Sequence, residues 1–135
     1  NPGLSPGYRV LHLTAASLVA ESRTLAMPAS IGSLPTDANQ EDFVPMGMAA
    51  AYKARRILAN GQLVVAAELL CAAQGLELLQ PLSAGGGVAG LYRRIREAPI
   101  AILPLGPDRP PAPDLERLAG AVAAGALDPG DDAPA

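Results

Sequence analysis

The chain has 135 residues, a length that suits one domain of ordinary size. Half of the residues are hydrophobic but only 3% are aromatic, which favours helices over strands, because strands prefer β-branched and aromatic side chains. A formal net charge of −3 provides no broad basic surface of the kind that nucleic acids or anionic membranes attract. We therefore predict an all-α protein that binds neither nucleic acid nor membrane.

The amino-terminal part of the sequence predicts a helix followed by a long loop. In residues 9–26, apolar side chains recur at steps of three and four, as on one face of an amphipathic helix. Pro28 ends this pattern. Residues 28–42 are rich in Pro, Ser, Gly, Asp and Asn and have no sustained period, which predicts a loop. Loops of this length in compact domains are often functional.

A long helix is predicted over residues 44–79, about 54 Å if it is continuous. Its second half, residues 63–79, is apolar almost all round, and such a helix has to be surrounded by protein. One chain of this size offers too few other helices, so we expect further chains or segments around it. Asn60-Gly61 could break the helix into a hairpin. We predict a single helix, because an internal Gly costs only about 1 kcal/mol relative to Ala.

The rest of the chain, residues 80–135, alternates between helix-breaking segments and short helices. Residues 85–87 are three glycines and predict a flexible turn, followed by a short helix over residues 88–97. The proline-rich residues 99–113 predict an extended linker. A last helix is expected over residues 114–127, with Asp114 as a plausible cap. Residues 128–135 contain only Pro, Gly, Asp and Ala, and we expect them to be disordered.

The only cysteine, Cys71, lies in the apolar half of the long helix. One cysteine cannot form an intrachain disulfide, so we expect a small core residue in a reducing compartment and a cytoplasmic protein. The sequence shows no signal peptide and no uninterrupted apolar stretch approaching roughly 18 residues. The first residue is Asn1 rather than Met, which hints that the chain is a piece of something longer.

Residues 34–47 carry a specific resemblance. They read Leu-Pro-Thr-Asp-Ala-Asn-Gln-Glu-Asp-Phe-Val-Pro-Met-Gly and resemble a motif of the histidine ammonia-lyase family, usually Thr-Ser-Ala-Asn-Gln-Glu-Asp-His-Val-Ser-Met-Gly. Residues 14–21 and 66–74 resemble the family's Thr-Ala-Ala-Ala-Leu-Val-Ser-Glu and Ala-Ile-Glu-Leu-Leu-Ala-Ala-Ala-Gln, in the same order and at the same spacing. The likeness is close over residues 1–80 and looser over residues 88–127.

This resemblance implies that residues 1–127 are the carboxy-terminal helical part of an aromatic amino acid ammonia-lyase. The implied reaction is the elimination of ammonia from a small amino acid substrate, L-histidine, to give urocanate. It also implies a homotetramer with a shared multi-subunit helical core, completed by the amino-terminal part of the same enzyme. The family's methylidene-imidazolone prosthetic group cyclises from Ala-Ser-Gly, which this sequence lacks. The group is therefore expected to form outside this chain, which alone should be inactive.

By the same resemblance, Glu41 lies in the active site, near the imidazole or amino group of the substrate. A carboxylate suits either partner, because both carry or acquire positive charge. Asn39 and Gln40 offer amide donors and acceptors that could bind the same substrate. The alternative for Asn39 to Asp42 is capping of the long helix, and capping is the role we assign to Asp42. No metal site is predicted.

Three residues depart from the usual form of the family: His12 replaces Gln, Phe43 replaces His and Pro45 replaces Ser. These changes bear on the substrate, so a tyrosine or phenylalanine ammonia-lyase or a related aminomutase remains an alternative. Glu41 favours histidine, because those relatives often lack a carboxylate at this position. A second alternative is a non-catalytic helical oligomerisation module. An Ala-Ser-Gly encoded upstream of Asn1 would distinguish that module from an enzyme.

Overall fold

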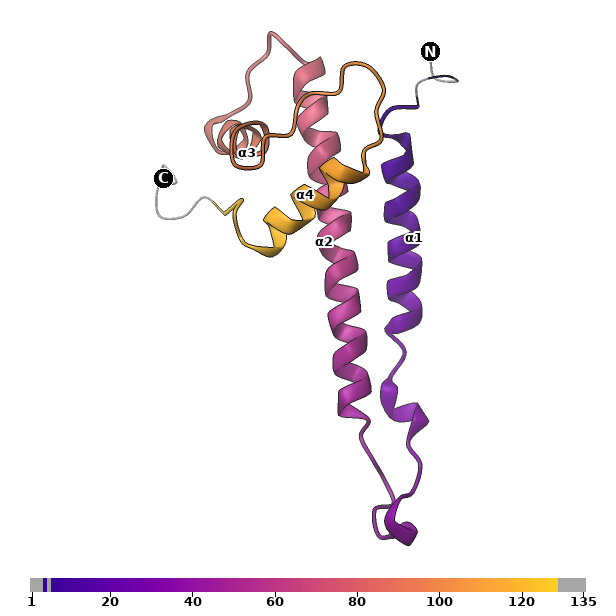
Figure 1. The fold of residues 1–135 in the computed structure, drawn as a ribbon. Coiled ribbons are helices and arrows are strands. Elements are labelled where there is room, and N and C mark those ends of the chain that lie inside the picture. Colours follow the sequence, from indigo (N-terminus) through magenta and orange to yellow (C-terminus); the bar gives the residue numbers. More distant parts are fainter. Residues whose placement is uncertain (1–3, 5, 129–135) are drawn as a thin grey trace. The chain divides into compact units, whose positions relative to one another are not determined.

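The structure is a computed structural model that describes residue 4 and residues 6–128. Within these residues the regular elements are all helices and there is no strand, as the composition predicts (Figure 1). Disorder is predicted for residues 128–135, and all of these except Asp128 lie outside the described residues. The elements are α1 (Arg9–Leu25), two 3-10 helices (Ala29–Gly32 and Asp37–Asn39), α2 (Gly47–Leu78), α3 (Gly86–Arg96) and α4 (Ala112–Ala123).

The prediction of one uninterrupted long helix is confirmed. α2 runs for 32 residues, about 48 Å at the rise of an α-helix, and Asn60-Gly61 lies within it without a reversal. The helix begins at Gly47 rather than Val44. By length and composition alone α2 could also cross a membrane, but the core helix of a soluble protein passes the same test.

The chain divides into two compact units, which are described separately. The core unit comprises residues 1–15 and 62–135, and the loop unit comprises residues 16–61. α1 and α2 each contribute their first part to one unit and their second part to the other.

The core unit is built on one face of the second half of α2. Ala66, Leu70 and Ala73 lie on this face, three and four residues apart, and all are buried. Small alanines allow neighbouring segments to approach closely. With only 3% aromatic residues, the core has few large side chains to fill wider gaps. The side chains that pack against them come from α1, α3, α4 and the segment before α4: Leu11, Ile95, Ile100, Ile102, Leu115 and Leu118.

The proline-rich segment before α4 corrects the prediction of an extended linker. Ile100 and Ile102 are only 5% and 0% exposed, so the segment packs into the core. The amide of Ile102 donates to the carbonyl of Ile95 at 3.0 Å, and the amide of Leu105 donates to Gln74 Oε1 of α2 at 2.7 Å. Ile100 and Ile102 are both buried although the backbone between them is not extended: Ala101 has a φ of 52°.

α3 is fastened to α2 by a polar cluster inside the core unit. The Tyr92 hydroxyl donates to Glu77, and Arg96 Nε lies 3.3 Å from Glu77 Oε1. The Arg96 guanidinium also stacks on the Tyr92 ring, 5.4 Å from its centroid. The hydrogen bond to Glu77 raises the pKa of Tyr92 above its usual value. This part of the basic cluster on α3 therefore forms an ion pair within the chain.

Three local expectations are wrong. Gly86 and Gly87 belong to α3 instead of a turn. Asp114 lies in the first turn of α4 without capping it; it pairs instead with Arg109, at 2.8 Å between Nη2 and Oδ2. Cys71 is exposed in this chain, because α2 buries only one face in the core unit. Val65 and Leu78 are exposed apolar residues in this half of α2.

Candidate functional site

The loop unit is an antiparallel helical pair joined by the connecting loop, which we define as residues 26–46 (Figure 1). Asn60 of α2 is 2% exposed and donates through Nδ2 to Glu21 Oε2 of α1 at 2.6 Å and to Ser22 Oγ at 3.2 Å. Arg56 adds an ion pair to Glu21 at 3.2 Å. The hydrogen bond from Asn60, and secondly Arg56, lower the pKa of Glu21. These contacts hold together the two helices from which the loop extends.

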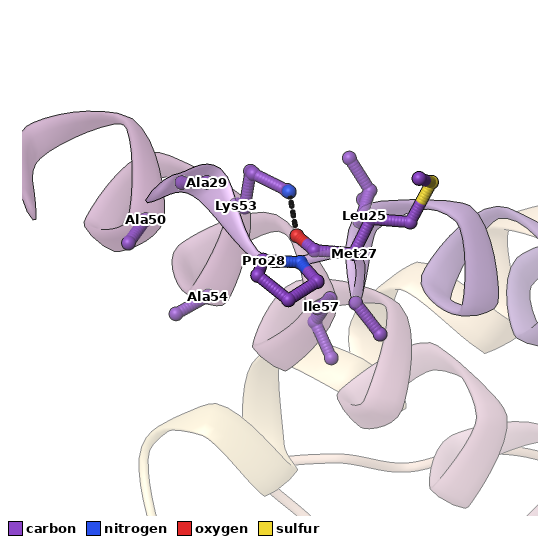
Figure 2. A pocket seen from close by; sticks show the side chains of 9 residues that line it. Leu25, Met27, Pro28, Ala29, Ala50, Lys53, Ala54 and Ile57 are labelled. Atoms are coloured by element: carbon purple, nitrogen blue, oxygen red, sulfur yellow. Dashed lines mark hydrogen bonds between the residues drawn. The ribbon is translucent and has the colours of Figure 1, made fainter. Parts of the chain in front are cut away.

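At the base of the connecting loop, the Lys53 ammonium donates to the carbonyl oxygen of Met27 (Figure 2). A cation suits this position, since Met27 follows the carboxyl end of α1, where helix carbonyls carry partial negative charge. Beside this contact lies an apolar cavity of about 240 Å³. It is lined by Leu25, Ala26, Met27, Pro28, Ala29, Ala50, Lys53, Ala54 and Ile57 (Figure 2). Asn39, Gln40 and Glu41 contribute nothing to its wall.

Beyond this base the two sides of the connecting loop are tied to each other. Ser33 Oγ accepts a hydrogen bond from the Val44 amide at 2.9 Å. Thr36 and Glu41 form an antiparallel bridge: the Thr36 amide donates to the Glu41 carbonyl at 2.9 Å, and the Glu41 amide donates to the Thr36 carbonyl at 3.3 Å. The loop is thus a folded structure whose end is a tight turn of four residues, 37–40.

This turn uses an uncommon backbone conformation. Asp37, Ala38 and Asn39 have φ values of 50°, 54° and 70°, in the left-handed region that L-residues other than Asn and Asp seldom adopt. The conformation costs roughly 1–2 kcal/mol for an ordinary L-residue, so Ala38 carries the clearest strain. Strained backbone of this kind clusters at functional sites, where the surrounding structure maintains it.

The turn presents the predicted site residues together. Thr36 Oγ1 donates to Glu41 Oε2 at 3.0 Å, and the Gln40 amide donates to the Asp37 carbonyl at 3.0 Å. Asn39, Gln40 and Glu41 are all exposed. One carboxylate and two side-chain amides at the end of a fixed loop can receive a cationic or hydrogen-bonding group of a ligand.

The helix-capping alternative for these residues is wrong. α2 begins at Gly47, and residues 42–46 before it have no regular structure, so Asp42 does not stand at the helix start. Sequence reasoning also missed Thr36. It lies inside the recognised motif, but its contact with Glu41 depends on a left-handed turn that the residue types do not indicate.

Over residues 4 and 6–128, no group of three or more His, Cys, Asp or Glu side chains is arranged to hold a metal ion. The sequence also contains no Ala-Ser-Gly, so this chain has no precursor for the prosthetic group that the resemblance implies. The carboxylate and amides at the end of the connecting loop can hydrogen-bond to a ligand and stabilise positive charge on it.

Comparison with known proteins gives a consistent result. The sequence profile described as aromatic amino acid lyase matches residues 1–97. Histidine ammonia-lyase of Symbiobacterium thermophilum is 48% identical over 127 residues, covering 94% of this chain and 24% of that protein. Histidine ammonia-lyase of Deinococcus radiodurans is 47% identical, with the same two coverages, 94% and 24%.

The likeness extends to three-dimensional structure. The crystal structure of histidine ammonia-lyase from Trypanosoma cruzi matches with a TM-score of 0.84 at 36% identity, covering 94% of this chain and 25% of that one. This chain therefore spans about a quarter of the length of the relatives that it matches. Together with the profile match over most of its residues, these similarities show that the chain belongs to the aromatic amino acid lyase family.

Proposed function

We propose that this chain is the carboxy-terminal part of a histidine ammonia-lyase, which eliminates ammonia from L-histidine to give urocanate. The observation that carries this proposal is the exposed Glu41 carboxylate, held by Thr36 at the end of the connecting loop. Asn39 and Gln40 lie beside it in the same turn. The similar proteins from Symbiobacterium thermophilum and Deinococcus radiodurans carry the name histidine ammonia-lyase, which supports this substrate.

In the proposed reaction, Glu41 binds the imidazole or amino group of the substrate and stabilises positive charge on it. Asn39 and Gln40 orient the substrate through their amides. Removal of a poorly acidic β-proton then yields the unsaturated acid and ammonia. The family's methylidene-imidazolone would supply the electrophile from a segment of the enzyme outside this chain, whose own residues do not form it.

The proposal is tested by steady-state ammonia release in the full-length enzyme, with histidine, tyrosine and phenylalanine compared under the same conditions. We expect histidine to give the highest kcat/KM, because the imidazole offers the cationic or hydrogen-bonding partner that Glu41 requires. Preference for tyrosine or phenylalanine would contradict the histidine assignment. Release from none of the three would favour the non-catalytic oligomerisation module.

The runner-up is a tyrosine or phenylalanine ammonia-lyase or aminomutase, and one observation favours it. Phe43, which stands where histidine-specific members have His, is 63% exposed and lies two residues from Glu41. An apolar ring beside the site would suit an apolar aromatic substrate better than an imidazole. Product analysis in the same assay separates an unsaturated acid from the β-amino acid that an aminomutase makes.

We also propose that the chain works as part of a cytoplasmic homotetramer, together with the amino-terminal part of the enzyme. The exposed apolar side chains along α2, among them Leu58, Val65 and Leu78, support this proposal, because a lone monomer rarely leaves such a surface uncovered. We expect the purified chain to self-associate in light scattering at micromolar concentration. A stable, well-folded monomer under these conditions would contradict the prediction.

A further inference from the structure

We propose that Thr36 is a positioning residue that orients the Glu41 carboxylate for the substrate. This inference rests on the proposed function, and it starts from the hydrogen bond between Thr36 Oγ1 and Glu41 Oε2, 3.0 Å long. The two residues are also joined through both backbone amides by the antiparallel bridge. The side-chain contact is therefore made between two positions that the backbone already holds opposite each other.

The local backbone explains why this contact can be maintained at an exposed place. Opposite residues in an antiparallel bridge bring their Cβ atoms to about 5 Å, a span that a Thr hydroxyl and a Glu carboxylate can bridge. The left-handed Asp37, Ala38 and Asn39 close the turn between them. The bridged pair and the left-handed turn thus form one local unit.

The chemistry of the contact suits positioning. A β-branched Thr side chain has few χ1 rotamers, so its hydroxyl presents a nearly fixed donor. The Glu side chain is long and loses considerable rotamer freedom when it is ordered. A hydrogen bond from the hydroxyl to Oε2 restrains this side chain before the substrate arrives and leaves Oε1 for the ligand. Orientation established in advance lowers the barrier of the reaction.

Thr36 has no other assignment in the loop. The bridge needs only its backbone, and its hydroxyl donates to the one carboxylate to which we assign a role with the substrate. The other threonine hydroxyls in the helical segments donate to carbonyls within α1: Thr14 to Val10 at 3.0 Å and Thr24 to Glu21 at 2.7 Å. Thr24→Val, in the same unit, is therefore the matched control for loss of a threonine hydroxyl.

The experiment is a double-mutant cycle in the full-length enzyme, with kcat and KM for the preferred substrate and the melting temperature measured for each variant. Thr36→Val has nearly the shape of the parent residue and keeps the backbone bridge but removes the hydroxyl. We expect kcat/KM to fall by about tenfold, the range for a lost hydrogen bond to a charged group. Thr36→Ser should recover most of this loss, and Thr24→Val should behave like the parent.

The cycle is completed by Glu41→Gln alone and by Thr36→Val in the Glu41→Gln background. If Thr36 acts through the carboxylate, its replacement should have little further effect once the charge is gone, because residues acting as a unit are not additive. Parental kcat/KM in Thr36→Val, additive losses in the double variant, or failure of Thr36→Ser to recover activity would each overturn the inference while leaving the role of Glu41 intact. Parental turnover in Glu41→Gln would instead overturn the proposed site, and the inference with it.

Discussion

Replacing Glu41 by Gln in the full-length enzyme should lower turnover by about 100-fold or more, the loss found when charge-stabilising or acid–base groups are removed. Gln keeps the size and hydrogen-bonding capacity of the side chain and removes only the charge. Because Glu41 is exposed in the connecting loop, its charge contributes little to folding, and the melting temperature should remain nearly unchanged. Steady-state ammonia release and thermal unfolding measure the two quantities.

Asp42→Asn is the matched control. Asp42 is adjacent to Glu41, also carries a carboxylate and is also exposed, but it takes no part in the bridge with Thr36 and does not cap α2. The same change of charge there should leave both turnover and melting temperature close to those of the parent. If Glu41→Gln turns over the preferred substrate at the parental rate, or if Asp42→Asn is equally slow, the assignment of Glu41 from the family motif is wrong.

The helices could be predicted from the sequence because their signals are periodic and long. α1 follows apolar steps of three and four up to the break at Pro28, and α2 has no breaker stronger than single glycines. The existence of the connecting loop follows equally from its Pro, Gly and Asn content. Periodicity does not predict which sides of α2 are covered by other segments. The face with Leu70 is buried within the chain, whereas Cys71 is exposed.

For the candidate site, the sequence indicates which residue types are present but does not predict their geometry. The motif identified Asn39, Gln40 and Glu41, but nothing in the sequence indicates that Ala38 adopts a left-handed backbone. Propensity disfavours this conformation for Ala, so it is imposed by the tertiary structure. The contact of Thr36 with Glu41 depends on that turn, and for this reason it emerges only from the structure.

The prediction of an extended linker in the proline-rich segment is wrong for a different reason. Its composition is that of a linker, and composition averages over positions. The structure depends on two of those positions, Ile100 and Ile102, whose side chains are buried in the core across a turn at Ala101. Pro99 and Pro104, on either side of this stretch, restrict the backbone and do not prevent burial of the isoleucines.

Because this segment packs into the core, Ile102→Ala should destabilise the protein by about 2–5 kcal/mol, as it leaves a cavity where a fully buried side chain was packed. Ile102 is 0% exposed, whereas its neighbour Leu103 is 69% exposed. Leu103→Ala should therefore change the free energy of unfolding by no more than about 0.5 kcal/mol. Denaturant unfolding of the parent and both variants, followed by far-ultraviolet circular dichroism, gives the comparison. Equal stabilities for the two variants would mean that the segment behaves as the linker its composition suggests, and that the contacts of Ile102 with the core contribute nothing to folding.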